Sequence, residues 1–281
     1  MKKKKLIINI ILFIFIIIFI YSLIQIIIHE NDNNKINKQI NDINKKITIK
    51  EIIDNENIEL IEQKEEINKS DPYWDYIKVN LIDVDFNNLK KINSDVKGWI
   101  QVNGTNINYP FVQTNDNDYY LNHSFDKSKN GGGWVFLDYR NNLVNNNEKN
   151  TILYAHGRVN KTMFGSLKNI LTSKWTKNKD NYIIKMSNEF ENTLWQVFSI
   201  YRIPNTSDYI QTEFKNDDEF NTFVQMLLNR SQFNFNTTVN FNDRILTLST
   251  CYNDNEKVVL HAKLIKKENK ESWLTFFIIF L

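Results

Sequence analysis

Cys251, the only cysteine of the 281-residue chain, ends the run Arg244-Ile-Leu-Thr-Leu-Ser-Thr-Cys251. With the two-residue period of a β-strand, the apolar Leu246 and Leu248 face one way, and Ser249 and Cys251 face the other. This pattern indicates a strand with one face in a core and a small polar face along a groove. A turn-like segment follows at once, so we expect the thiol to be accessible.

A second strand, Thr151-Ile-Leu-Tyr-Ala155, ends in the same manner at His156-Gly157. A thiol and an imidazole, each at the end of a strand, are the minimum set for nucleophilic catalysis by cysteine. The commoner fate of a free cysteine is that of a small buried apolar side chain. The position of Cys251 at a strand end, beside Ser249 and Thr250, favours the reactive interpretation.

The start of the chain predicts a membrane anchor. Lys2 to Lys5 precede Leu6 to Ile28, 23 residues without a charge, which in a helix would span a hydrocarbon layer of about 30 Å. A cleaved signal peptide would have a shorter apolar region, roughly 7–15 residues, ending at an A-x-A-like site. The lysines favour a cytoplasmic N-terminus. We therefore predict a basic tip at 1–5, a transmembrane helix at 6–28, and the rest outside the cytoplasm.

Residues 29–70 predict a helical stalk or linker. Ile36, Ile40, Ile43 and Ile47 recur at the spacing of one helix face, and isoleucines from 52 to 61 continue the pattern less regularly. A coiled coil is the weaker alternative because the heptad is not sustained. Pro72, in Ser70-Asp-Pro72, marks the start of a domain at 71–267. Residues 268–281 form an apolar tail to which we assign no role.

The domain at 71–267 has many short strands and few helices. Residues 99–112 predict a hairpin with an Asn103-Gly104 turn. Residues 217–230 predict the clearest helix, with acidic residues in its first turn and one apolar stripe. Strands and helices do not alternate regularly. This favours a mainly β fold with helices (α+β), a closed or nearly closed β-barrel rather than a parallel sheet.

Composition narrows the function classes. The net charge is +2, and Lys2 to Lys5 alone contribute four positive charges, so nothing indicates a nucleic-acid partner. The four histidines lie far apart in the sequence, and we expect no metal site. Outside the cytoplasm, where disulfides form, Cys251 has no partner in its own chain.

Several segments together resemble the sortases, and specifically class B. The resemblance covers roughly residues 72 to 266, and the helix at 217–230 before the cysteine strand is the feature that indicates class B. The matching segments are Gly98-Trp-Ile, Thr105-Asn-Ile-Asn-Tyr-Pro110, Asn115-Asp-Asn-Asp-Tyr-Tyr-Leu-Asn-His123, Phe136-Leu-Asp-Tyr-Arg140, Leu153-Tyr-Ala-His-Gly157, Thr162-Met-Phe-Gly-Ser-Leu167, Asp208-Tyr-Ile-Gln-Thr212, Thr247-Leu-Ser-Thr-Cys251 and His261-Ala-Lys263.

The resemblance implies a closed β-barrel of about eight strands, with N-terminal helices and a long helix before the cysteine strand. It implies a membrane-anchored cysteine transpeptidase at the surface of a Gram-positive-type envelope, with the catalytic domain extracellular. Such an enzyme cleaves a C-terminal sorting signal of secreted proteins after threonine and joins the acyl group to a peptidoglycan precursor or cross-bridge amine. Cys251 would be the nucleophile and His156 the general acid–base, with no cofactor.

One position departs from the family pattern. Where the family has an arginine that holds substrate and steadies the oxyanion, this chain has Lys257. Lysine is a point charge without the guanidinium fork, so the exchange is not conservative. Three interpretations are open: Lys257 fills the role less well, Arg244 or Arg158 reaches in instead, or the enzyme is weak or inactive. A plain surface lysine at a turn is the remaining alternative.

The remaining candidate residues are predicted to contact substrate or to pack. Tyr154 shares a strand face with His156, and Ser249 shares one with Cys251. The resemblance places four more in the substrate groove. We interpret His123 and His261 as ordinary strand or turn residues. These four groove positions are Tyr209, Ile210, Asn117 and Leu121.

Three functions remain open from the sequence. The first is the sortase-type transpeptidase. The second is a cysteine protease in which water resolves the thioester, because both share the first half-reaction. The third is a non-catalytic module that binds sorting peptides, which the lysine at position 257 motivates.

Overall fold

Eight strands close into a mixed β-barrel in this computed structural model, which describes residues 2–53, 57–61, 72–144 and 148–270. The strand order around the barrel is β10-β7-β6-β5-β4-β8-β9-β11, and pairing of β11 with β10 closes it. The barrel strands are β4 (Val96–Val102), β5 (Asn108–Val112), β6 (Phe136–Leu137), β7 (Asn150–Tyr154), β8 (Ile183–Asn188), β9 (Glu191–Pro204), β10 (Ile245–Cys251) and β11 (Glu256–Asn269). The predicted fold class is confirmed.

Most neighbouring strands of the barrel are antiparallel, but β10 and β7 are parallel, as are β5 and β6. The predicted hairpin is β4 and β5, and Gly104 in its turn has a φ of +69°, a conformation that glycine adopts without strain. The parallel pair matters most for function. Parallel neighbours end at the same rim of a barrel, so the segments that leave β7 and β10 start side by side.

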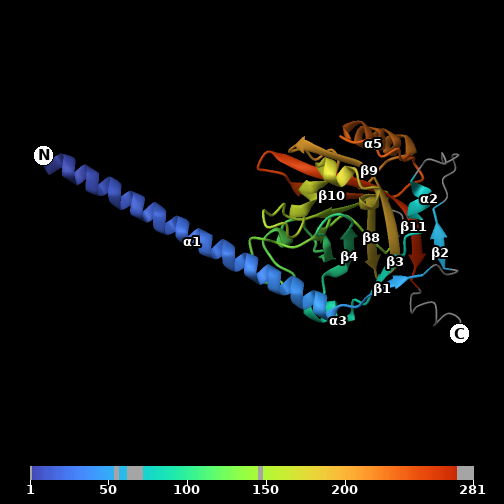
Figure 1. Cartoon of the computed structure of the whole chain (residues 1–281), viewed down its shortest axis with the longest axis horizontal. Helices are drawn as coiled ribbons and strands as arrows, with labels where there is room; N and C mark the ends of the chain where they lie inside the picture. The colour runs from blue at the N-terminus through green and yellow to red at the C-terminus, as the bar shows by residue number, and fades with distance from the viewer. Residues whose placement is uncertain (1, 54–56, 62–71, 145–147, 271–281) are drawn as a thin grey trace.

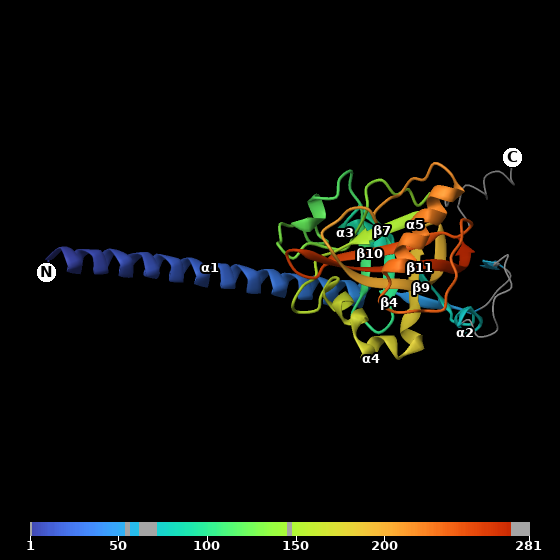
Figure 2. The same ribbon diagram turned by 90° about the horizontal axis from the view of Figure 1, so that it is seen from above.

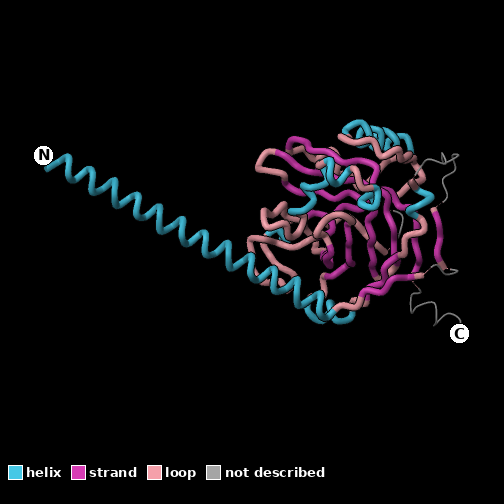
Figure 3. The backbone as a smooth tube through the Cα atoms, in the orientation of Figure 1, coloured by secondary structure: helices cyan, strands magenta, loops and turns pink. Residues whose placement is uncertain are grey.

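Shorter elements surround the barrel (Figures 1 and 3). Strands β1 (Ile49–Ile52) and β3 (Leu81–Val84) form a separate antiparallel pair, and β2 (Ile58–Leu60) pairs with the end of β11. The helices and 3-10 turns are α2 (Tyr73–Tyr76), α3 (Asn87–Ile92), η1 (Tyr119–Leu121), η2 (Gly165–Leu171), α4 (Ser173–Thr176), η3 (Lys179–Tyr182) and α5 (Asp217–Arg230).

Helix α5 lies on the outside of the barrel over β9 and has the predicted bounds (Figure 2). Asn216 caps it by accepting a hydrogen bond from the Glu219 N–H at 2.9 Å, and three acidic residues fill the first turn, where the helix dipole favours negative charge. Its apolar stripe packs with Phe198 and Val259 of the barrel wall. The helix thus covers an outer face that would otherwise expose apolar surface.

Helix α1 (Lys2–Lys46) is one continuous helix that projects away from the barrel (Figures 1 and 2). Among the described residues it is the one helix long and apolar enough to cross a membrane. Its C-terminal part docks on the domain: Ile36 and Ile43 are buried, and Ile40 and Ile47 pack beside them. The predicted one-faced stripe is confirmed.

The helical prediction for the second half of the stalk is wrong. Residues 49–52 and 58–60 are strands β1 and β2. Ile49 and Ile52 are three residues apart, a spacing that also suits one face of a helix, and pairing with β3 and β11 decides the outcome. The predicted boundary at Ser70-Asp71 and nearly all of the apolar tail lie outside the described residues.

Candidate active site

Two parallel strands bring Cys251 and His156 to the same rim of the barrel. The last register pair of β10 and β7 is Ser249 with Tyr154. Two residues further along, the two chains reach Cys251 and His156, on the same face as that pair. The Thr250 hydroxyl donates to the Ala155 carbonyl at 2.8 Å and ties the two strand ends together. The predicted thiol–imidazole neighbourhood follows from this register.

The loop after His156 passes close to the cysteine. A Cβ atom at Gly157 would lie 2.1 Å from the carbonyl oxygen of Cys251, so only glycine fits there. Any side chain at this position would push the two strand ends apart. The glycine of the His156-Gly157 motif is therefore required by the close approach of the Cys251 backbone.

A third strand supplies Lys257. Strand β11 runs antiparallel to β10, and its Lys257 lies directly opposite Cys251. The Lys257 ammonium donates a hydrogen bond to the Cys251 sulfur at 3.0 Å. The thiol is exposed to solvent. A positive charge at this distance stabilises a thiolate, the nucleophilic form of cysteine.

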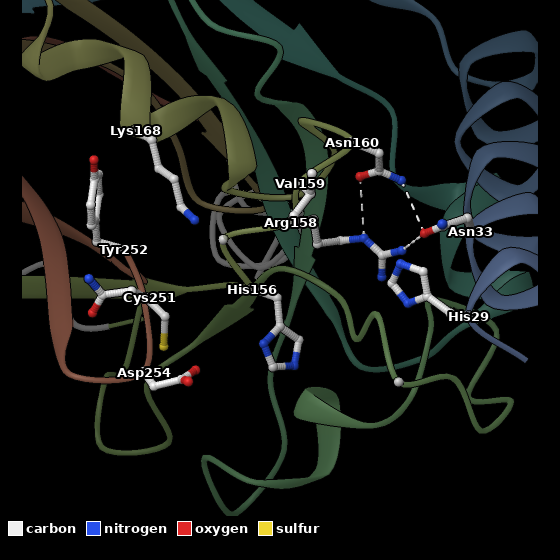
Figure 4. A pocket seen from close by; sticks show the side chains of 13 residues that line it. His29, Asn33, His156, Arg158, Val159, Asn160, Lys168, Cys251, Tyr252 and Asp254 are labelled. Carbon is white, nitrogen blue, oxygen red and sulfur yellow. Dashed lines mark hydrogen bonds between the residues drawn. The ribbon is translucent and has the colours of Figure 1, made fainter. Parts of the chain in front are cut away.

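His156 is half-buried, and a hydrogen bond orients its ring. Its Nε2 lies 2.8 Å from the Leu121 carbonyl oxygen, which can only accept, so Nε2 carries the hydrogen. The other nitrogen, Nδ1, is on the side toward Cys251 (Figure 4). In this arrangement Nδ1 is the atom free to exchange a proton with groups at the cysteine.

All nine predicted site residues line one groove with a volume of about 400 Å³. Tyr209 and Ser249 are buried and hydrogen-bond each other at 2.8 Å, so they form the floor of the groove. The other residues form its walls. The nine are Cys251, His156, Lys257, Ser249, Tyr154, Tyr209, Ile210, Asn117 and Leu121, and Phe136, Ala155, Thr206 and Thr250 complete the lining.

A buried carboxylate organises the groove, and the sequence did not single it out. Asp138 accepts hydrogen bonds from the Tyr154 hydroxyl at 2.9 Å and the Asn117 amide at 3.1 Å. Arg140 donates to both of its oxygens, at 2.8 and 2.7 Å, and also donates to the Ile210 carbonyl at 2.9 Å. The Asp138–Arg140 ion pair therefore positions three residues that line the groove. They are Tyr154, Asn117 and Ile210. Phe136-Leu-Asp-Tyr-Arg140 contains both residues, but nothing in the spacing marks Asp138 as their common partner.

This network shifts two pKa values. Burial alone would raise the pKa of the Asp138 carboxyl, but hydrogen bonds from Arg140 and Tyr154 outweigh it and hold that pKa below its usual value. Burial, followed by the charge of Asp138, raises the pKa of the Tyr154 hydroxyl. The carboxylate and the phenol are therefore both held in the protonation states that keep the groove intact near neutral pH.

Two arginines considered as alternatives to Lys257 lie elsewhere. Arg244, at the opposite end of β10, makes a double hydrogen bond with Glu191 at 3.0 and 2.7 Å. Arg158 lies beyond His156 and donates to Asn33 of α1. Neither lines the groove. The suggestion that Arg244 or Arg158 replaces Lys257 is therefore wrong for this conformation.

The other histidines have structural surroundings. His261 is fully buried between the Tyr201 hydroxyl and the Thr247 hydroxyl, at 2.8 and 2.9 Å. His123 stacks on Tyr119 with ring centroids 3.9 Å apart. Across the described part of the chain, no group of three His, Cys, Asp or Glu side chains could hold a metal ion.

Comparison with known proteins gives consistent matches. The sortase domain model matches residues 100–265. Sortase B of Staphylococcus aureus is 40% identical over 186 residues, covering 64% of this chain and 75% of that protein. A Staphylococcus aureus sortase B–substrate complex has a TM-score of 0.60 and 38% identity, covering 64% of this chain and 84% of that one. A sortase B complexed with triglycine has a TM-score of 0.60 and 37% identity, covering 64% and 85%.

Proposed function

The chain belongs to the sortase family, class B, and we propose that it is a membrane-anchored transpeptidase acting on secreted proteins. It would cleave their C-terminal sorting signal after threonine and transfer the acyl group to a cell-wall amine. The observation that carries this proposal is the meeting of a thiol, an imidazole and an ammonium, Cys251, His156 and Lys257, on the rim of one groove.

In the first half-reaction the Cys251 thiolate attacks the threonine carbonyl carbon of a peptide lying in the groove. The Lys257 ammonium, 3.0 Å from the sulfur, is placed to stabilise the negative charge that develops on the carbonyl oxygen. His156, whose Nδ1 has taken the proton of the Cys251 thiol, then gives that proton to the departing amine, and the carbon–nitrogen bond breaks. The product is a thioester between the client protein and Cys251.

In the second half-reaction an amine from the cell wall attacks the thioester carbon. Its nitrogen forms the new bond, its proton passes to His156, and the carbon–sulfur bond breaks to release the Cys251 thiolate. The relatives solved with a substrate and with triglycine support an amine acceptor here, and a peptidoglycan precursor or cross-bridge amine is the acceptor we propose.

The location we propose follows from α1. Residues 6–28 would cross the cell membrane once, with the basic tip at 1–5 in the cytoplasm and residues 29–70 linking it to an extracellular catalytic domain at 71–267. Protease added to intact cells should reach the catalytic domain while Lys2 to Lys5 stay protected. Release of a soluble form beginning near residue 29 would contradict the anchor.

The test uses a quenched fluorescent peptide with an Asn-Pro-x-Thr-type signal, incubated with the full chain in detergent, with and without an amine acceptor. We expect cleavage in both cases and an amide product only with the amine. Hydrolysis without any transfer would indicate a protease instead. Binding without cleavage would indicate a peptide-binding module. A methanethiosulfonate reagent should stop cleavage by wild type, because Cys251 is the exposed thiol.

A further inference from the structure

A second cleft, of about 580 Å³, opens on the other side of the Cys251–His156 pair (Figure 4). It shares only these two residues with the peptide groove. Its walls come from five places in the chain: α1, the segment at Gly131, the loop after His156, η2, and the loop after Cys251. The lining residues are His29, Asn33, Gly131, His156, Gly157, Arg158, Val159, Asn160, Lys168, Cys251, Tyr252, Asn253 and Asp254.

The α1 wall is fixed to the domain by several contacts. The Asn33 carboxamide oxygen accepts hydrogen bonds from Arg158 and, at 3.2 Å, from the Asn160 amide. The neighbouring Asp32 carboxylate accepts the Gly131 N–H at 3.0 Å. Ile36, one turn further along, is fully buried. The cleft is therefore part of the folded structure and not a gap beside a loose helix.

Two opposite charges flank the cysteine inside this cleft. Lys168 and Asp254 lie on either side of Cys251 (Figure 4). Within the described residues, Lys168 has no carboxylate partner, and its ammonium lies 5.6 Å from the Tyr252 ring centroid. The Asp254 side chain likewise has no hydrogen-bond donor among them, although its backbone carbonyl accepts from Asn205. Both charges are thus available to a ligand.

The electrostatic surroundings of Lys168 favour an anion there. Burial lowers the pKa of the Lys168 ammonium, and the neighbouring Lys161 lowers it further, while the charge of Cys251 raises it. An incoming carboxylate would stabilise the charged ammonium. Acylation removes the negative charge of the Cys251 sulfur. A carboxylate of the ligand would then be the anion that stabilises the Lys168 ammonium.

We propose that this cleft is the acceptor site and that it selects an amine carrying a carboxylate nearby, with Lys168 contacting the carboxylate and Asp254 the ammonium. This inference rests on the proposed transpeptidase function. With the client peptide in the groove, the cleft is the other described route to the thioester carbon. Asp254 holds the ammonium beside the thioester until it loses one proton to solvent. The neutral amine then forms the amide bond, its second proton goes to His156, and sulfur leaves as the thiolate.

The test compares glycine with glycinamide, which present the same amine with and without a carboxylate. The quantity measured is the ratio of transfer product formed from the two acceptors, in wild type and in Lys168→Met. The intrinsic reactivity of each amine affects both enzymes equally. Dividing the wild-type ratio by the Lys168→Met ratio therefore leaves only the effect of Lys168. A partly exposed ion pair is worth up to about 1 kcal/mol, so we expect the glycine preference to fall about twofold to fivefold in Lys168→Met.

Matched variants separate the possible outcomes. Lys168→Arg keeps the charge and should keep the preference, and Lys161→Met removes a nearby charge outside the cleft and should also keep it. Asp254→Asn should lower transfer to both acceptors by a similar factor. An unchanged preference in Lys168→Met would overturn the inference, while peptide hydrolysis without acceptor would still support the proposed function. If wild type cleaves no peptide at all, the proposed function and the inference both fail.

Discussion

Replacing Lys257 tests the role we propose for the residue opposite Cys251. Lys257 lies opposite Cys251 in the β10–β11 ladder, and such cross-strand pairs have Cβ atoms about 4.5–5.5 Å apart. The lysine side chain spans this separation and brings its ammonium 3.0 Å from the sulfur. Lys257→Met keeps most of the aliphatic length and removes the charge. Any loss of activity would then report the charge and not the packing.

The expected loss follows from the position of the ammonium. Removing one donor from an oxyanion site typically costs about 10²–10³ in rate. Lys257 lies at the exposed rim of the groove, where water screens its charge, so we expect the lower end. A loss of about 10² in kcat corresponds to about 2.7 kcal/mol. Lys257→Arg should stay within about tenfold of wild type, because the guanidinium supplies the same charge with more donors.

The assay is steady-state cleavage of the fluorescent sorting peptide by the full chain, with kcat and KM measured separately. We expect Lys257→Met to lower kcat with little change in KM. Lys267→Met is the matched control, because Lys267 lies on the same strand near its other end and pairs with Glu59. If Lys257→Met keeps kcat within threefold of wild type, Lys257 does not stabilise the oxyanion. Arg202, which stacks 3.9 Å from the Tyr252 ring centroid, would be tested next.

Three further substitutions probe other parts of the site. Cys251→Ala should abolish peptide cleavage and change the free energy of unfolding by less than about 0.5 kcal/mol, because the thiol is exposed; residual cleavage would contradict its role. Asp138→Asn should cost about 1–3 kcal/mol of that free energy and raise KM for the peptide more than it lowers kcat; equal effects on kcat and KM would argue against a positioning role. Burial, with a smaller contribution from Arg230, lowers the pKa of His261 to about 3, while an unfolded histidine binds a proton below about pH 6.5. The contribution of His261 to stability is therefore complete above pH 6.5 and falls by up to about 1.4 kcal/mol per pH unit below it. His261→Gln should flatten this slope in urea unfolding between pH 5 and 7, and an unchanged slope would assign it to other groups.

The sequence predicted the centre of the site because that centre depends on strand ends. A two-residue period and the positions where two strands stop were enough to select Cys251 and His156 as candidate residues, while the parallel pairing that brings them to one rim came from the structure. The match to the family placed Lys257 beside the cysteine in the same way. The long helix at 217–230 was predictable because its periodicity and its acidic first turn agree.

Other features depend on long-range contacts that no local pattern encodes. Asp138 acquires its importance from partners 16 and 21 residues away, Tyr154 and Asn117. The strands at 49–52 and 58–60 carry isoleucines that suit either secondary structure, and only their pairing partners decide between the two. Lys168 lies one residue after a segment that matches the family, yet its approach to the cysteine depends on how η2 packs against the Cys251 loop.

The docking of α1 has a consequence for how this enzyme is studied. Asn33 lies five residues beyond Ile28, about 7.5 Å along the helix axis, so one wall of the second cleft stands close to the bilayer surface if residues 6–28 form the anchor we propose. A recombinant fragment that begins after residue 46 keeps the barrel strands but lacks that wall and exposes the surface that Ile36 and Ile43 cover. At the acceptor site that we propose, kinetics measured on such a fragment describe a more open cleft than the chain with α1 possesses. Reconstitution of the full chain in nanodiscs keeps α1, and with it this wall of the cleft, in the protein that is assayed.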